Sequence, residues 1–315
     1  MIFFFCGPNT YAARQQIAKL VAEYTKKTGS NLGLERLDGA RLKSEELTAT
    51  LQAVPFLSRS RLVIIEDLGS NKAIAPNIAS YLKGIPATTV AVFYDPAVDQ
   101  RGSYVKALGA AAKTVKFEPL SLAKLQQWVV REAAAAGAEI ERPAVGRLID
   151  MAGEDQWRLS GEIAKLAAHH SPITVADINL LVEESHAETI FNLVEAMTAG
   201  EVGGALRLYR QLRQDGLSEV YMLSMIIWQL RNLLLAKAAG KVSPPELAKA
   251  AGMSPFVAGK ALTKRHLFSE EQLKTGFLQA VDTDYQIKSG AGAADLLVEQ
   301  LLYHLAGRPT AGAAG

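Results

Sequence analysis

Short apolar runs alternate with helical patterns up to Pro119, and this alternation constrains the fold of the chain more than any other feature. The apolar runs cover residues 2–6, 34–37, 62–65, 90–94 and 114–117. Strands that alternate with helices are typical of a parallel sheet covered on both faces. The sequence therefore predicts an α/β domain with a mostly parallel sheet over residues 1–119.

Strand signals end after residue 119, and the rest of the chain has helical periodicity. Leu125 and Val129 recur on one face of a helix that Gly137 ends. Longer helical patterns begin near residue 187 and end at glycines. We expect a small helical domain over 120–185, an all-helical domain over 186–307 and a disordered tail over 308–315.

Residues 3–17, FFFCGPNTYAARQQI, have the strand, glycine turn and helix start that cradle a nucleotide phosphate in many proteins. The phosphate loop G-x-x-x-x-G-K-S/T also needs a lysine for the phosphate charge and a hydroxyl for Mg²⁺. Counted from Gly7, its second glycine, lysine and hydroxyl positions hold Ala12, Ala13 and Arg14. A helix turns about 100° per residue, so Arg14 does not take the direction of the missing lysine. We predict an ordinary turn capped by Asn9 or Thr10, with no nucleotide and no cofactor.

Composition excludes several classes of protein. Apolar residues make up 49% and charged residues 21% of the chain, which excludes wholesale disorder. The 34 basic and 32 acidic residues give a net charge of +2, so any DNA contact must be local. The single cysteine, Cys6, excludes a disulfide within the chain, and it is expected to pack as a small apolar residue.

Membrane and export signals are weak. Residues 2–6 are too short for the apolar core of a secretory signal, and no basic residue precedes them. The most apolar later stretch, residues 220–236, is interrupted by Gln229, Arg231 and Asn232, which favours a core helix over a membrane span. The sequence predicts a soluble cytoplasmic protein without membrane contact.

Candidate catalytic and metal-binding residues do not form a working set. Glu66 and Asp67 follow a buried strand, but without a phosphate-loop lysine and hydroxyl they have no nucleotide to organise, and a solvated turn is expected. His169 and His170 are neighbours in sequence, so on a helix they diverge. We therefore expect no metal site and no active site in this chain.

An apolar pair after a helix is the more informative feature. The amphipathic helix in EELTATLQAVPFLSRSRLVII stops at Pro55, and Phe56 and Leu57 follow immediately. Its apolar face is expected to carry Leu47, Leu51 and Val54. The pair either caps the domain core, as in a hydrophobic staple, or forms an exposed plug for a partner's pocket. Burial contributes about 1.5–3 kcal/mol for each side chain, and micromolar binding needs about 8 kcal/mol. Such a plug would anchor an interface without supplying all of its affinity.

Residues 246–262, ELAKAAGMSPFVAGKAL, have the spacing of a helix-turn-helix, with a glycine turn at Gly252. Lys260, Lys264 and Arg265 are candidates for contact with DNA phosphates. Two short packed helices joined at a glycine give the same pattern, so helical packing is the alternative.

Several of these segments together resemble the δ subunit of the bacterial DNA polymerase III clamp loader. That family is related to the AAA+ ATPases, but its members do not themselves bind ATP. The resemblance covers nearly the whole chain and is carried by residues 3–16, 51–68, 173–185, 253–262 and 268–290.

The resemblance implies a fold and a set of partners. It implies an AAA+-like α/β domain over 1–119 without a phosphate loop, a helical lid over 120–185, and a helical collar over 186–307 that joins the γ/τ and δ′ subunits. Members of the family bind one face of the ring-shaped sliding clamp, β, and hold an interface open while ATP-binding sister subunits drive assembly on primed DNA.

The family's clamp-binding element is an adjacent hydrophobic pair after the second helix, and here it falls on Phe56 and Leu57. Gln52 and Ala53 occupy the start of that element. The related δ′ subunit carries zinc-binding cysteines in many bacteria, and the single Cys6 of this chain favours δ. Two other functions stay open on the residues alone: an ATPase with a substitute for the missing lysine, and a helix-turn-helix DNA-binding regulator.

Overall fold

The structure is a computed structural model that describes residues 1–55, 58–99 and 101–306. The chain divides into two compact units, Met1–Pro119 and Leu120–Gly315, and each is described by itself. The predicted tail, 308–315, lies outside the described residues.

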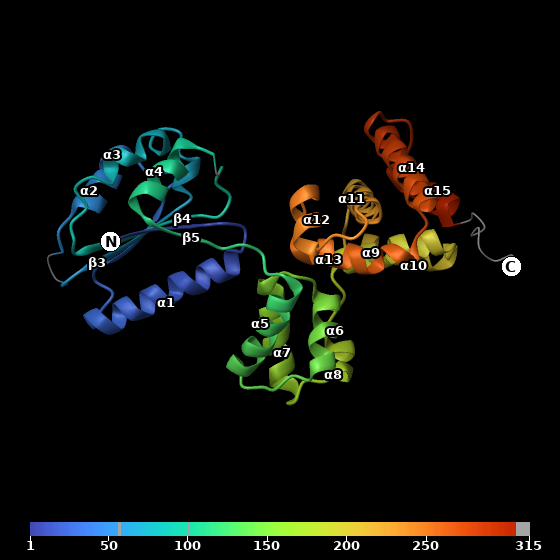
Figure 1. Ribbon diagram of the computed structural model, residues 1–315, viewed down its shortest axis with the longest axis horizontal. Helices are drawn as coiled ribbons and strands as arrows, with labels where there is room; N and C mark the ends of the chain where they lie inside the picture. The colour runs from blue at the N-terminus through green and yellow to red at the C-terminus, as the bar shows by residue number, and fades with distance from the viewer. Residues whose placement is uncertain (56–57, 100, 307–315) are drawn as a thin grey trace. The chain divides into compact units, whose positions relative to one another are not determined.

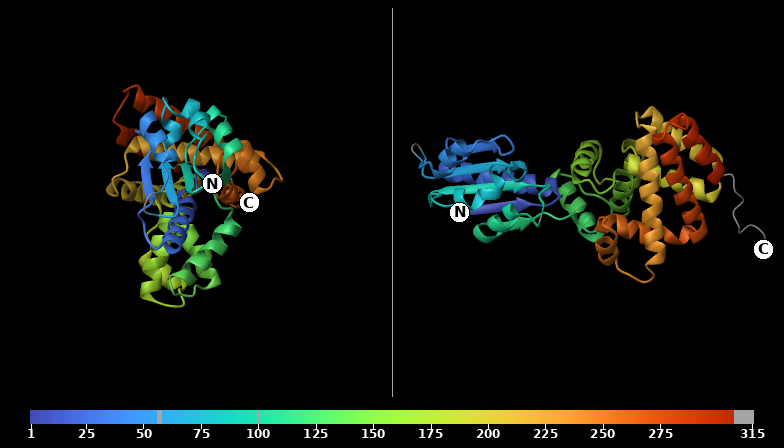
Figure 2. Two further views of the ribbon diagram at one scale, coloured as in Figure 1. Left: turned by 90° about the vertical axis from the view of Figure 1, so that its left-hand side faces the viewer. Right: turned by 90° about the horizontal axis from the view of Figure 1, so that it is seen from above.

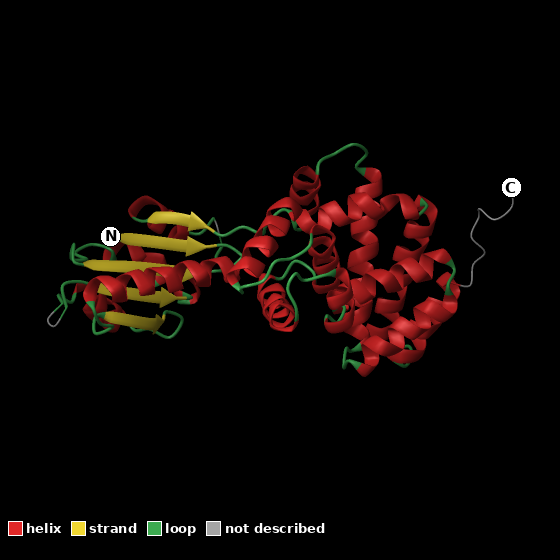
Figure 3. Ribbon diagram, turned by 90° about the horizontal axis from the view of Figure 1, so that it is seen from below, coloured by secondary structure: helices red, strands yellow, loops and turns green. Residues whose placement is uncertain are grey.

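The first unit contains a parallel sheet, as the sequence predicts. In the order β2-β3-β4-β1-β5, each strand pairs in parallel with its neighbours (Figure 3). The strands are β1 (Ile2–Cys6), β2 (Leu34–Asp38), β3 (Arg61–Glu66), β4 (Thr89–Asp95) and β5 (Lys113–Lys116). Since the strands are parallel, all their amino ends lie along one edge of the sheet and all their carboxyl ends along the opposite edge.

Alternate residues of the buried strands point to opposite faces of this sheet, and each face meets its own helices. Phe5, Ile64 and Val92 pack in one cluster with Ile17 of α1. The other face packs against α2, α3 and α4, which lie across the sheet from α1 (Figure 1). These helices are α1 (Thr10–Thr28), α2 (Ser44–Gln52), α3 (Ile78–Tyr81) and α4 (Ser103–Ala111), with short 3₁₀ turns at Leu68–Ser70 and Ala75–Asn77.

Apart from one isolated β-bridge between Ile140 and Ile173, the regular secondary structure of the second unit's described residues is helical, and the unit has two hydrophobic clusters. One cluster is built from α5 (Leu122–Ala135), α6 (Arg142–Ala152), α7 (Gln156–His169) and α8 (Val175–Leu181). The other is built from α9 (His186–Ala199), α10 (Val202–Gln214), α11 (Glu219–Ala238), α12 (Pro244–Ala251), α13 (Pro255–Lys264), α14 (Glu270–Lys288) and α15 (Ala294–Ala306). A 3₁₀ turn, Arg265–Leu267, follows α13.

Helix α11 is a core helix, as predicted, and it packs along α14 (Figure 2). Gln229 and Asn232, which interrupt its apolar run, are both buried. Across the part of the chain that the structure describes, no helix has both the length and the apolar character needed to cross a bilayer.

Candidate functional site

The turn after β1 lies against the chain that leaves β5. Gly7 has a φ of +113°, and a Cβ built there would lie 2.5 Å from the carbonyl oxygen of Phe117. The backbone N–H of Phe117 donates to the carbonyl of Cys6 at 2.7 Å. Residues 6–9 and 116–118 are therefore bound to each other where a phosphate loop would hold its ligand.

Backbone N–H groups that would cradle a phosphate are used inside the turn. The N–H of Asn9 donates to the Phe117 carbonyl at 2.9 Å, and that of Thr10 to the Pro8 carbonyl at 2.9 Å. Asn9 caps α1, as the sequence predicts, and its side chain accepts from the N–H of Ala12 at 3.0 Å. A phosphate would have to displace these internal acceptors.

Arg14 pairs with Glu66 at the carboxyl end of β3. Its Nη1 and Nη2 donate to Oε1 and Oε2 of Glu66, each at 2.6 Å, and its guanidinium lies 5.1 Å from the centre of the Tyr94 ring. The prediction that Glu66 lies in a solvated turn is wrong, because this bidentate pair leaves its side chain only 20% exposed. Asp67, the next residue, is exposed and has a φ of 56°.

Asp95 ends β4 beside this pair, and it is buried. Its carboxylate accepts from the N–H of Gly69 at 2.7 Å and from the hydroxyl of Tyr104 at 2.5 Å. Burial raises the pKa of Asp95, and burial together with the Asp95 carboxylate raises the pKa of Tyr104. Asp67, Asp95 and Asp99 line a hollow of about 400 Å³, but no cluster of histidine, cysteine or carboxylate groups among the described residues could hold a metal ion.

The predicted clamp-binding segment follows α2 at the opposite, amino-end edge of the sheet. Phe56 and Leu57 lie outside the described residues. Gln52 is exposed at the end of α2. Val54 is 71% exposed, so the prediction that it shares the buried helix face of Leu47 and Leu51 is wrong: the helix ends at Gln52, and the backbone of Ala53 is already extended.

The Arg61 side chain joins this segment to the sheet, and we call its contacts the Arg61 clasp. Arg61 is 7% exposed. Its Nη1 donates to the carbonyls of Thr50 at 2.7 Å and Ala53 at 2.9 Å, and its Nη2 pairs with the Glu35 carboxylate on β2. One buried guanidinium thus connects the end of α2 with β2 and β3.

A second set of contacts fixes the chain just before β3. The Tyr24 hydroxyl donates to the Ser60 carbonyl at 2.9 Å. A Cβ on Gly33 would lie 2.7 Å from the Ser60 carbonyl oxygen and 2.3 Å from the Tyr24 hydroxyl. Both ends of the segment 54–60 are therefore packed closely against the sheet.

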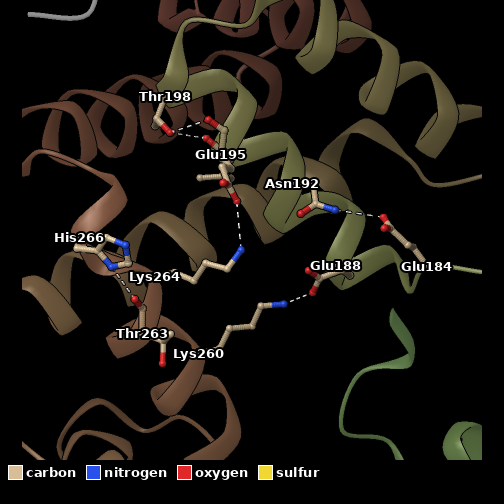
Figure 4. A network of polar contacts seen from close by, with 10 residues as sticks. Glu184, Glu188, Asn192, Glu195, Thr198, Lys260, Thr263, Lys264 and His266 are labelled. Carbon is tan, nitrogen blue, oxygen red and sulfur yellow. Dashed lines mark hydrogen bonds and ion pairs between the residues drawn. The ribbon is translucent and has the colours of Figure 1, made fainter. Parts of the chain in front are cut away.

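The three candidate DNA contacts are engaged inside the helical unit, and Figure 4 shows two of them, Lys260 and Lys264. Lys260 pairs with Glu188, and Lys264 lies 3.4 Å from Glu195. Both ammonium groups also lie over the Phe191 ring, at 4.7 and 4.9 Å from its centre. Arg265 donates to the carbonyls of Ala236 and Gly240, each at 2.7 Å.

Two other predicted features have different outcomes in the structure. Helices α12 and α13 do form a helix pair with a turn at Gly252, whose φ is +68°. The prediction that His169 and His170 diverge is wrong, because α7 ends at His169 and both rings lie near Asp177, at 3.8 and 3.6 Å.

Sequence reasoning missed Arg61 and Glu35. The available signal was a charged residue at the start of the otherwise apolar strand RLVII, since a charge at a buried strand position needs a partner. The identity of that partner depends on strand order, which local periodicity does not give.

Comparison with known proteins gives two family matches. The family model described as DNA polymerase III, delta subunit, matches residues 3–118, and the model of the C-terminal domain of the DNA polymerase III delta subunit matches residues 187–305. The DNA polymerase III subunit delta of Bacillus subtilis is 24% identical over 320 residues, which cover 96% of this chain and 92% of that protein.

A solved structure has the same fold over nearly the whole chain. The Bacillus subtilis DNA clamp loader delta protein superposes with a TM-score of 0.65 at 22% identity, covering 98% of this chain and 95% of that chain. The fold is thus a parallel α/β domain followed by helical domains, as in that delta protein. With both the α/β domain and the C-terminal helical domain matched, the chain belongs to the family of DNA polymerase III delta subunits.

Proposed function

We propose that this chain is the δ subunit of a clamp loader, and that it binds the sliding clamp and holds one interface of the ring open for loading onto primed DNA. The observation that carries this proposal is the delta-subunit family match over residues 3–118, the domain that contains Phe56 and Leu57. The similarity to a clamp loader delta protein supports it. In this proposal the two side chains form the plug that enters a pocket on the clamp, with Gln52 at the edge of the contact.

We propose that the chain does this without binding ATP. The blocked position beside Gly7 and the internal use of the N–H groups of Asn9 and Thr10 support this proposal. An ATPase would need a cation that reaches the phosphates. Arg14 instead binds the Glu66 carboxylate through both of its terminal nitrogens. Nucleotide chemistry is then the work of the sister subunits.

The helical unit is the proposed connection to those subunits. Its two hydrophobic clusters support a lid over 120–185 and a collar over 186–307, and the collar would join the γ/τ and δ′ subunits. We propose that the chain works in the bacterial cytoplasm, because a clamp loader acts on chromosomal DNA.

A DNA-binding regulator is the second candidate, supported by the helix pair α12 and α13. Contact of Lys260, Lys264 and Arg265 with DNA stays a prediction, and it would require these side chains to leave their present partners. A regulator should distinguish an operator-like duplex from a scrambled one, whereas a loader subunit should bind both weakly and lose that binding as salt rises.

Binding to the sliding clamp of the same bacterium tests the proposed function. We expect the wild-type chain to bind the clamp without nucleotide, and the Phe56→Ala/Leu57→Ala variant, folded equally well by circular dichroism, to lose that binding. Leu47→Ala is unsuitable as a control, because Leu47 is fully buried and the variant would lose stability. Lys106→Ala, at an exposed site on α4 of the same unit, is the control. Equal binding by the wild type and the double variant would contradict the assignment of the plug.

A further inference from the structure

We propose that Arg61 is a positioning residue for clamp binding: it fixes the end of α2, from which the chain continues to the proposed clamp-binding pair. This inference rests on the proposed function. It concerns the described residues around the segment, and it assigns to Arg61 and Glu35 a role in setting the affinity for the clamp.

The Arg61 clasp acts on carbonyls that need donors. The last carbonyls of a helix have no amide partner further along the helix, and α2 ends in the extended backbone of Ala53. Arg61 donates to the carbonyls of Thr50 and Ala53, one on each side of the helix end. Its positive charge is also favourable at the negative end of the helix dipole.

The clasp is anchored at its far side by a carboxylate. Glu35, on the edge strand β2, pairs with Nη2 of Arg61, and it orients the guanidinium so that Nη1 points at the two carbonyls. The Glu35 side chain is 41% exposed and that of Arg61 is 8% exposed. The cation is therefore the buried member of the pair.

Arginine suits this role better than lysine. Its planar guanidinium carries donors that point in fixed, different directions, whereas an ammonium group at the end of a flexible stem cannot hold three acceptors in this spacing. Lysine at position 61 would keep the charge opposite Glu35 and lose at least one of the two carbonyl contacts.

Both ends of the segment 54–60 are then fixed to one sheet edge. Ala53 is held by Arg61, and Ser60 accepts from the Tyr24 hydroxyl at 2.9 Å. A segment with fixed ends has fewer arrangements to lose on binding, so less of the binding free energy is spent on ordering it. The fraction of chains ready to bind rises in proportion, which increases the apparent affinity.

The test compares Arg61→Lys with a matched substitution of Arg14 in α1. Arg14 also pairs with a carboxylate in this unit, Glu66 at the carboxyl end of β3, and among the described residues its side chain contacts Glu66 and Tyr94 rather than residues 54, 55 or 58–60. We expect Arg61→Lys to weaken binding to the sliding clamp about tenfold, which corresponds to about 1.4 kcal/mol. Arg14→Lys should stay within about twofold of the wild type, since it leaves the clasp intact.

The rates separate positioning from a general loss of stability. A positioning role predicts a slower association rate and a nearly unchanged dissociation rate, because the contacts made in the complex stay the same. Surface plasmon resonance with immobilised clamp gives both rates. Unfolding midpoints of the two variants show that binding is measured on folded chains.

Glu35→Gln is the second variant, in case Arg61→Lys folds poorly. It keeps a hydrogen-bond acceptor on the half-exposed side of the clasp and removes the charge, so a decrease of about threefold in affinity is expected. A wild type that binds the clamp while folded Arg61→Lys and Glu35→Gln bind equally tightly would overturn the role of Arg61 and leave the proposed function intact. A wild type that does not bind the clamp would overturn both.

Discussion

An arginine–glutamate ion pair lies at each end of strand β3, and the surroundings of the two pairs differ. At the carboxyl end, Arg14 binds Glu66 beside a turn that the chain leaving β5 fills. At the amino end, Arg61 binds Glu35 and holds the end of α2, just before the exposed Val54. The same type of ion pair therefore links α1 to β3 at one edge of the sheet and holds the end of α2 at the other edge.

Under the proposed function, the difference between the two edges explains how a fold that resembles a nucleotide-binding domain can work without binding a nucleotide. In open α/β sheets, ligands usually bind at the carboxyl ends of the strands. Here the donors and charges at that edge have partners from this chain itself, such as Phe117 and Glu66. We propose that binding has moved to the amino-end edge, where the partner is a protein.

The largest expected effect comes from Gly7→Ala. A methyl group there meets the Phe117 carbonyl at 2.5 Å, and a φ of +113° is strained for any other residue. We expect the α/β unit to lose at least about 3 kcal/mol of its free energy of unfolding. Hydrogen exchange of β1 amides measures this unit by itself, since Trp128, Trp157 and Trp228 all lie in the helical unit.

Gly109→Ala is the control for that substitution. Gly109 lies within α4, and a Cβ there meets open space, so this variant should be neutral or stabilised by up to about 1 kcal/mol. Equal protection of the β1 amides from hydrogen exchange in the wild type and in Gly7→Ala would show that the Phe117 carbonyl does not lie against Gly7.

Gly33→Ala makes the corresponding change at the amino-end edge. Its methyl group would displace the Ser60 carbonyl or the Tyr24 hydroxyl, and we expect a loss of about 2 kcal/mol in stability. Unlike Gly7→Ala, it should also weaken clamp binding, because it moves the chain just before β3. Isothermal titration with the clamp, at a temperature where both variants are folded, checks this. A larger loss of clamp binding in Gly7→Ala than in Gly33→Ala would contradict the assignment of clamp binding to the amino-end edge.

Arg14→Met should have a moderate effect on stability and none on clamp binding. It removes both donors from Glu66, but the Arg14 side chain is 41% exposed, so water replaces part of the interaction. We expect a loss of about 1 kcal/mol in the free energy of unfolding. Hydrogen exchange of the β3 amides measures this loss of stability. A decrease of more than about threefold in affinity for the clamp would show that the Arg14–Glu66 pair also affects clamp binding at the opposite edge.

The smallest expected effect is a pH dependence from Asp95 at the carboxyl-end edge. Burial raises the pKa of Asp95 above its ordinary value of 3.8, so the folded chain keeps this proton to a higher pH than the unfolded chain. The contribution of Asp95 to the free energy of unfolding is therefore largest below its ordinary pKa of 3.8 and decreases as the pH rises through its pKa in the folded chain.

Asp95→Asn removes this titration, and it keeps partners for Gly69 and Tyr104. The stability of the wild type relative to this variant should therefore fall as the pH rises through the raised pKa of Asp95. Unfolding by urea at several pH values, followed by exchange of β4 amides, measures it. A difference that stays constant with pH would contradict the role assigned to burial.

Much of the fold could be predicted from the sequence, because its signals are local. The five strands of the described α/β unit, the Asn9 cap and the change to helices after Pro119 follow from apolar runs, a turn residue and periodicity within a few residues. The error at Val54 has the same origin: helical spacing continues on paper, but the helix ends at Gln52.

The surroundings of the candidate sites could not be predicted in the same way. Lys260 pairs with Glu188, 72 residues away, and Arg61 pairs with Glu35 through a strand order that no local pattern contains. The closing of the turn at Gly7 depends on a backbone carbonyl of Phe117, and a carbonyl carries no residue-type signal at all. Long-range partners decide whether a charged residue is available to a ligand.

We propose that the clamp binds at the amino-end edge of the sheet and that the turn after β1, at the carboxyl-end edge, binds no nucleotide. Hydrogen exchange of the chain with and without the sliding clamp, each in the absence and presence of Mg²⁺ and ATP, tests it most directly. We predict that the clamp protects peptides covering residues 52–60, that peptides covering 7–14 and 66–70 do not change, and that ATP changes neither set. Protection of 7–14 by ATP, or protection by the clamp at the carboxyl-end edge in place of 52–60, would contradict the account.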